Sequence, residues 1–363
     1  MLISDALKRE NNNFDLIRLA AAVMVIISHA YAINRIDGFI EPLYKITHLT
    51  TMAEIAVKVF FFISGLVVTN SMLKSKSVIK FIQSRALRIF PAYLVVILVT
   101  ALFIGPIVSQ LKYYEYFSSH EPYLYILKNI QLDTYYTLPG VFEHTKNKFG
   151  LNSVNGSLWT IPYEIAAYGF VFIAFLLTKF RFKSLLSLFC ILIITEPFSP
   201  IKGLLLCHSN DSAIYLLAPH FALGALLALN QSKISINLIF PCVFLALFII
   251  LKTPEVRQLM LGFSICLFLL YLCTRAFCVK IKIKHDISYG LYLWAFPIQQ
   301  IYSSFANFTI FQSQIASVIT SAVVAIISFK LVEKPFMEWS VKINNRIDIY
   351  SSITNNIKSD IQR

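Results

Sequence analysis

The feature that most constrains this sequence is a series of ten apolar runs, most of them long enough to cross a lipid bilayer. A transmembrane helix needs about 20 predominantly apolar residues. Only 14% of the residues are charged, against about 25% in an average soluble domain, which excludes an ordinary soluble protein. The sequence therefore predicts an all-α, polytopic integral membrane protein with about ten transmembrane helices. The runs cover residues 14–34, 55–72, 86–108, 157–178, 184–196, 213–230, 234–251, 257–273, 287–305 and 311–332.

The distribution of Lys and Arg predicts how the chain is oriented in the membrane. With the N-terminus in the cytoplasm, 21 of the 32 Lys and Arg residues fall in cytoplasmic segments and nine in outer segments. The positive-inside rule therefore places both the N-terminus and the C-terminus in the cytoplasm. The net charge of +13 thus reflects membrane topology and not nucleic-acid binding. We expect a transmembrane domain over residues 1–336 and a short cytoplasmic tail over residues 337–363.

Two ionisable residues lie within the first apolar run. Arg18 and His29 are eleven positions apart, which in a helix is three turns plus about 20° and a rise of about 16.5 Å. They therefore share one helix face, with Arg18 nearer the cytoplasm. Ionisable residues inside a membrane are usually functional, and histidine is suited to general-base chemistry near neutral pH. The alternatives are a snorkelling arginine and a histidine that serves helix packing.

A carboxylate and a second histidine are further candidates inside the membrane. Glu164 is expected about 6 Å outward from mid-membrane and His29 about 7.5 Å, so Glu164 can orient the imidazole and stabilise its protonated form. A structural Glu paired with another helix is the alternative. His220, in the sixth run, is the second candidate histidine.

Two arginines lie at the start of the third apolar run, before Ile89, Phe90 and Pro91. Arg85 and Arg88 lie in the inner loop just before the helix, three positions apart, so they share one face of the helix end and can fork onto phosphates. Together with Arg18 and His29 they form a line from the cytoplasm into the membrane. Such a line suits a long ligand with phosphates at one end and a reactive group at the other. Membrane topology alone would also place cations here.

A long outer loop, residues 109–156, carries seven of the 18 Tyr residues. Tyrosines at a membrane interface commonly form an aromatic belt. The alternative is a platform for a sugar, since an aromatic face with a hydroxyl group suits a carbohydrate.

Short motifs occur in order along nearly the whole chain, from about residue 13 to residue 336. They are Phe14-Asp15-Leu16-Ile17-Arg18 leading to His29, Phe60-Phe61-Phe62-Ile63-Ser64-Gly65-Leu66, Arg85 with Arg88 and Pro91, Ser157-Leu158-Trp159-Thr160 with Glu164, Phe221 to Gly224, Ser288-Tyr289-Gly290-Leu291-Tyr292-Leu293-Trp294, and Glu333-Lys334-Pro335. This ordered set resembles acyltransferase family 3, the bacterial membrane-bound acyltransferases that acylate cell-surface glycans and small molecules. Ala295 departs from the pattern, because many members have histidine there.

The resemblance implies a donor, an acceptor and a location. The donor is acyl-CoA, most often acetyl-CoA, on the cytoplasmic side, and the acceptor is a hydroxyl of a surface polysaccharide or of its lipid-linked sugar precursor. The protein is then a multi-pass protein of the bacterial inner membrane that acts on the bilayer's lipid-linked or surface glycans. The six Cys form no CxxC pair, so we expect no metal site. A transporter or flippase of a lipid-linked sugar is the alternative function.

The resemblance also implies roles for individual residues. Arg85 and Arg88 hold nucleotide phosphates and Arg18 steadies the polar arm of the donor. His29 either deprotonates the acceptor hydroxyl or carries the acyl group transiently, with Glu164 beside it as the second catalytic residue. Gly65 allows either a close approach to substrate or a small-residue helix contact. The candidate substrate-binding residues are Ser64, Trp159 and Tyr163.

Overall fold

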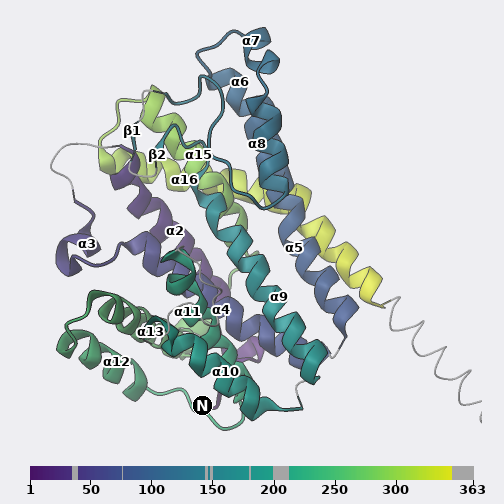
Figure 1. Cartoon of the computed structure of the whole chain (residues 1–363), viewed down its shortest axis with the longest axis vertical. Helices are drawn as coiled ribbons and strands as arrows, with labels where there is room; N and C mark the ends of the chain where they lie inside the picture. The colour runs from purple at the N-terminus through teal and green to yellow at the C-terminus, as the bar shows by residue number, and fades with distance from the viewer. Residues whose placement is uncertain are drawn as a thin grey trace, which may run out of the picture.

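Helices make up nearly all of the structure, a computed structural model that describes residues 1–34, 40–75, 77–143, 146–147, 150–179, 181–198 and 212–345 (Figure 1). A helix coincides with each of the ten apolar runs, and the prediction of an all-α polytopic membrane protein is confirmed. In the described part, six helices are long and apolar enough to cross a membrane, and three shorter apolar helices accompany them. The helices at the runs are α2 (Phe14–Ile33), α4 (Met52–Ser75), α5 (Val78–Val99), α9 (Thr160–Thr178), α10 (Lys183–Thr195), α11 (Ser212–Leu229), α12 (Ile239–Ile250), α13 (Pro254–Cys273), α15 (Ser288–Phe305) and α16 (Ile310–Ser328).

The remaining elements are short and lie mostly in the connections. They are α1 (Ile3–Ala6), α3 (Pro42–Thr47), α6 (Gly105–Val108), α7 (Tyr113–Ser118), α8 (Glu121–Ile130), α14 (Ala276–Lys280) and the antiparallel strands β1 (Lys146–Asn147) and β2 (Gly150–Leu151). A π-helical turn, Thr100–Ile104, joins α5 to α6. Helices α6, α7 and α8 project together at one end of the molecule (Figure 1). In this outer layer Tyr116 and Tyr125 are buried, whereas Tyr113, Tyr114 and Tyr123 are exposed.

Two helices extend beyond their apolar runs. Helix α5 begins at Val78, so Arg85 and Arg88 are helical. The prediction that they lie in a loop is wrong. A helix needs no apolar side chains where it leaves the lipid, and the apolar run therefore marks only its membrane part. Helix α16 continues through a π-helical turn, Phe329–Glu333, and stays helical to residue 345. This extension includes the first part of the predicted tail; residues 346–363 lie outside the described chain.

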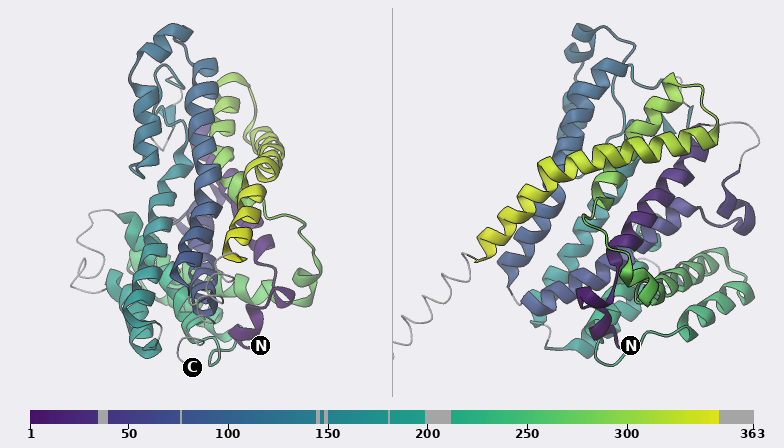
Figure 2. Two further views of the ribbon diagram at one scale, coloured as in Figure 1. Left: turned by 90° about the vertical axis from the view of Figure 1, so that its right-hand side faces the viewer. Right: turned by 180° about the vertical axis from the view of Figure 1, so that it is seen from behind.

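The helices form two groups (Figures 1 and 2). Helices α2, α4, α5, α9 and α15 run side by side, and α16 crosses behind α15 and α2. Helices α10 to α13 form the second group, beside the N-terminus. The end of α16 lies against the start of α5, because the amide of Gln83 donates to the Ser340 carbonyl and Asn344 donates to Ser84.

Helices α4 and α11 join the two groups through contact between their backbones. A Cβ atom at Gly65 would lie 2.1 Å from the carbonyl oxygen of Phe221, and a Cβ atom at Gly224 would lie 2.1 Å from the carbonyl oxygen of Phe62. Small residues allow helices to approach closely in a membrane, where apolar burial alone gives no driving force. Gly65 therefore makes a small-residue helix contact, one of the two alternatives.

We predict that Gly224→Val lowers the free energy of unfolding by about 1–3 kcal/mol, because the valine side chain must displace the α4 backbone. Gly169→Ala is the matched control, since nothing lies within 4 Å of its Cβ position, and it should leave stability unchanged or slightly raised. Thermal unfolding of the purified proteins in detergent measures both. Equal midpoints for wild type and Gly224→Val would contradict the close packing.

Candidate active site

The site is organised around an aspartate that binds two arginines. Asp286 lies just before α15, and its Oδ2 accepts hydrogen bonds from Arg18 of α2 and Arg88 of α5, each at 3.1 Å. Arg18 also binds Asp15, one turn earlier on α2, at 3.0 Å. The backbone N–H and hydroxyl of Ser288 donate to the other oxygen, Oδ1, of Asp286. One carboxylate thus ties α2, α5 and α15 together.

The surroundings of Asp286 keep it ionised. Burial alone would raise the pKa of this carboxyl, but the charges of Arg18 and Arg88 and the hydrogen bonds from Ser288 lower its pKa to about 2. The side chain of Asp286 is 14% exposed, so its charge is only partly screened by water. The two ion pairs therefore persist throughout the physiological pH range.

A cavity of about 170 Å³ opens beside this cluster, between α4, α5, α9 and α15. Three arginines and one carboxylate line it, so an anionic group is favoured inside it. In the described chain, the buried Nε of Arg85 has no hydrogen-bond partner, which leaves a donor for a ligand. The polar residues of this inner cavity are Arg18, Ser64, Arg85, Arg88, Thr160, Glu164, Tyr168, Ser288, Tyr289 and Tyr292.

A larger cavity of about 910 Å³ adjoins the inner one at the end lined by the N-terminal segment and by the segment before α15. The two share four lining residues, Arg18, Val67, Arg88 and Tyr289. Three further cations line the larger cavity, from the N-terminal segment and from the segment before α15. They are Arg9, Lys282 and Lys284. Four carboxylates, Glu10, Asp15, Asp286 and Glu333, line it as well. Together the cavities form a path that starts wide, with charges of both signs, and narrows to the three arginines between the helices.

Glu164 is held by a tyrosine on its own helix. The hydroxyl of Tyr168, one turn later on α9, donates to Oε1 of Glu164. The hydroxyl of Ser64 on α4 donates to the same tyrosine oxygen at 3.1 Å. This chain of hydrogen bonds fixes the carboxylate in the inner cavity, where it faces the arginines.

His29 is buried outside the inner cavity. Its ring packs edge-on against Phe296 of α15, with 5.5 Å between centroids, and it is not among the described residues that line the inner cavity. Tyr292, one turn before Phe296, does line that cavity and shares a hydrogen bond of 2.9 Å with Thr160. Phe296 lies one helical turn, or about 6 Å, beyond Tyr292 on α15, so His29 contacts α15 one turn past a residue that lines the inner cavity. Both Arg18 and His29 meet the α15 segment, so they share a face of α2 as their spacing indicates.

The structure thus brings five of the eight candidate residues to one cavity: Arg18, Ser64, Arg85, Arg88 and Glu164. It does not place Glu164 and His29 in the same cavity. Trp159 packs edge-on against Tyr163 at 5.8 Å, and Tyr163 lines a separate apolar crevice. His220 is buried near Phe263, with its Nδ1 2.8 Å from the Leu216 carbonyl oxygen.

Sequence reasoning missed Asp286, Tyr168 and Thr160. Asp286 precedes the Ser288-Tyr289-Gly290 motif by two residues, and a carboxylate beside a helix start was the available signal. Tyr168 lies four positions after Glu164, the spacing at which helical side chains meet. Their partners on other helices could be known only from tertiary structure.

Comparison with known proteins gives a family. The acyltransferase domain of acyltransferase family 3 matches residues 11–332. The chain belongs to this family. It is 29% identical over 342 residues to an O-acetyl transferase of Shigella phage Sf6, covering 90% of this chain and 96% of the relative. It is also 33% identical over 168 residues to nodulation protein 10 of Rhizobium leguminosarum bv. viciae, covering 43% and 42%. No solved structure gives a significant match.

This family membership makes the chain a membrane acyltransferase. A family 3 acyltransferase requires an acyl donor.

We predict that Asp286→Asn lowers the free energy of unfolding by about 1–3 kcal/mol, because two partly exposed guanidinium groups, those of Arg18 and Arg88, lose their shared partner. Asp15→Asn removes a more exposed partner of Arg18, 31% against 14% exposed, and should cost less than about 1 kcal/mol.

The pH dependence of unfolding separates these effects further. The pKa of Asp286 is lowered from 3.8 to about 2, so its stabilisation is complete above about pH 4 and is lost as the pH falls toward 2. Thermal unfolding midpoints measured from pH 7 downward should show this loss in the wild type and not in Asp286→Asn. Identical pH profiles would refute the role of Asp286.

Proposed function

We propose that this membrane acyltransferase moves an acetyl group from cytoplasmic acetyl-CoA to a hydroxyl of a cell-surface polysaccharide or of its lipid-linked precursor. The observation that carries the proposal is the pair of adjoining cavities, which run from the cytoplasmic side past Arg18 and Arg88 toward the region of His29. The relative named O-acetyl transferase, which the chain matches over 90% of its length, supports an oxygen acceptor.

The donor fits the shape and charge of the path. The larger cavity has the volume and the cations for a nucleotide with phosphates, and guanidinium groups bind phosphate oxygens in a bidentate manner. Arg88 and Arg18 lie where the larger cavity meets the inner cavity. An extended arm that carries a thioester would then pass between α4, α5 and α15 with its reactive end toward Thr160 and Tyr292.

His29 is the proposed general base. The acceptor hydroxyl attacks the thioester carbonyl, His29 takes the hydroxyl proton, and the carbon–sulfur bond breaks to release the CoA thiolate, which the protonated histidine can reprotonate. A transient acyl-histidine is the second route, in which the same nitrogen attacks first and the acceptor then takes the acyl group. In both routes His29 and the thioester meet near the Tyr292 end of the inner cavity.

Glu164 has a different role in this proposal from the one predicted from its depth in the membrane, which was to orient the imidazole of His29. It lies in the inner cavity with the arginines and accepts a hydrogen bond from Tyr168. We assign it to binding and orienting the polar arm of the donor, with Ser64 and Tyr168 as its supports. The acceptor would approach from the outer side, where Tyr113, Tyr114 and Tyr123 are exposed on α7 and α8.

We predict that His29→Ala lowers the rate of acetyl transfer by about 10²–10⁴-fold, the usual contribution of a general base or nucleophile. His120→Ala is the control, because His120 is an exposed residue of the outer layer. Acceptor-dependent release of CoA thiol from acetyl-CoA by protein in lipid nanodiscs measures the rate. Full activity in a folded His29→Ala protein would refute the role of His29.

We predict that Arg85→Gln raises the KM for acetyl-CoA by about tenfold or more, because one charge-assisted contact is worth about 1.5–3 kcal/mol. Stability should change little, since the Nε of Arg85 has no hydrogen-bond partner within the described chain. Arg257→Gln is the control, because Arg257 lies near the start of α13 and is not among the described residues that line either cavity. If the KM for the donor is unchanged, Arg85 does not bind it.

A further inference from the structure

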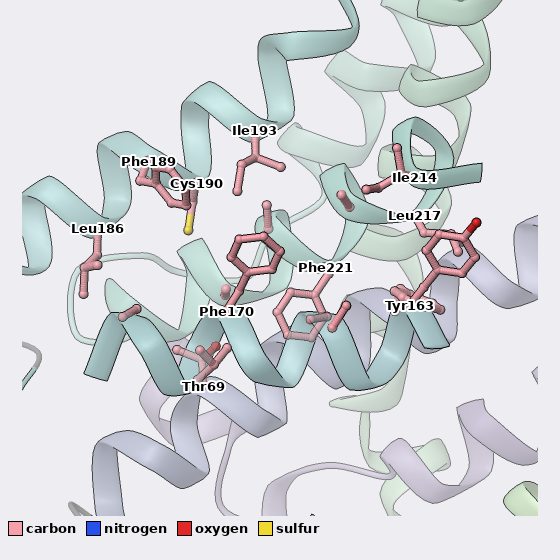
Figure 3. A pocket seen from close by; sticks show the side chains of 18 of the residues that line it. Thr69, Tyr163, Phe170, Leu186, Phe189, Cys190, Ile193, Ile214, Leu217 and Phe221 are labelled. Atoms are coloured by element: carbon pink, nitrogen blue, oxygen red, sulfur yellow. The ribbon is translucent and has the colours of Figure 1, made fainter. Parts of the chain in front are cut away.

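A third cavity, separate from the two adjoining cavities lined by arginines, lies between α9, α10 and α11. This crevice has a volume of about 120 Å³. Figure 3 shows Leu186, Cys190 and Ile193 of α10 facing Phe170 of α9 and Phe221 of α11 across it. Thr69 and Tyr163 supply the only hydroxyl groups among the described residues that line it, so it suits hydrocarbon and not a polar ligand.

Small side chains create the crevice. Alanines face it from both long walls, from α9 and from α11, where longer side chains would have filled the space. They are Ala166, Ala167 and Ala174 on α9 and Ala218, Ala222 and Ala225 on α11.

The crevice opens on the side that faces lipid. Phe170 and Phe189 line it and are also 47% and 37% exposed. Beyond them on α10, Leu188 and Leu192 are exposed as well. In a bilayer, a hydrocarbon chain can therefore enter between α9 and α10 without crossing water.

Helix α9 forms a wall between the crevice and the inner cavity. Thr160, Glu164 and Tyr168 face the inner cavity, whereas Tyr163 and Ala167 face the crevice. At one point the two spaces are separated by a single side chain, because Phe61 of α4 lines both. The crevice and the inner cavity thus have one wall residue in common, Phe61.

We propose that the crevice binds the hydrocarbon chain of a lipid-linked sugar acceptor, of the polyprenyl type. The proposal rests on the proposed function, in which the sugar must reach the region of His29 while its chain stays in lipid. Such a chain needs an apolar passage beside the site. Four phenylalanine rings suit an unsaturated, methyl-branched chain: Phe61, Phe170, Phe189 and Phe221.

Shape, and not hydrophobicity, has to provide the selectivity. The hydrocarbon chain of the acceptor is in an apolar environment both before and after binding. Only van der Waals contact and preorganisation therefore contribute to its binding free energy. A side chain that fills the crevice should therefore remove binding, whereas an equal change on the neighbouring lipid-facing surface should not.

The test compares Ala166→Phe with Ile173→Phe. Ala166 lines the crevice and is exposed enough to accept a larger side chain, while Ile173, on the same helix, is 50% exposed and does not line it. Binding of a long-chain polyprenyl phosphate to the purified protein is measured by native mass spectrometry, with phosphatidylglycerol as the competitor. We expect Ala166→Phe to weaken polyprenyl phosphate binding about tenfold, or about 1.4 kcal/mol, and Ile173→Phe to bind like the wild type.

Cys190 provides a second readout. Its sulfur points into the crevice (Figure 3), so in a variant whose other five cysteines are Ser, polyprenyl phosphate should protect it from a membrane-permeant maleimide. Equal protection by phosphatidylglycerol, or unchanged binding by Ala166→Phe, would overturn the proposal. A wild type that binds polyprenyl phosphate in the crevice but transfers no acetyl from acetyl-CoA would instead overturn the proposed function.

Discussion

The ion pairs of Asp286 hold the functional half of this protein together. In a low-dielectric interior an unpaired arginine is costly, and each cation must either reach water or find a carboxylate. Arg18 and Arg88 come from helices far apart in the sequence, and both bind one oxygen of Asp286. The hydroxyl of Ser288, at the start of α15, holds that carboxylate in turn. Separating the three helices would therefore leave a charged side chain without its partner. The basic path between the helices follows from this anchor.

The same constraint explains how the molecule is divided. Polar side chains collect on the faces of α2, α4, α5, α9 and α15 that surround the two adjoining cavities. Helices α10 and α12 carry mostly exposed apolar residues and provide the lipid-facing side of the second group. The glycine contact between α4 and α11 joins the halves. The arginine-lined inner cavity and the apolar crevice thus lie on opposite sides of α9, with Phe61 between them.

Much of the fold and part of the site could be predicted from the sequence. Apolar run length sets the position of each spanning helix, since a bilayer has a fixed thickness. Helical periodicity likewise predicts that Arg18 and His29 share a face of α2, and Arg18 binds Asp286 just before α15 while His29 packs against Phe296 of α15. Helix ends outside the lipid could not be predicted in this way, because residues 78–85 and 334–345 are helical although polar and charged residues interrupt their apolar ones. Depth was also a poor guide to partners: Glu164 and His29 lie at similar predicted depths, yet different neighbours surround them.

The sequence by itself determined the membrane class, the positions of the apolar helices along the chain and, through its ordered motifs, the acyltransferase family. These properties depend on local composition and spacing, which the chain carries in any conformation. Only the tertiary structure decided that Asp286 pairs with Arg18 and Arg88, that Phe296 stands against His29, and that an apolar crevice lies behind Glu164. Each of these contacts joins residues more than a hundred positions apart or depends on how helices are rotated about their axes. No local pattern encodes that rotation; it results from packing the small, bulky and charged side chains of all the helices at once.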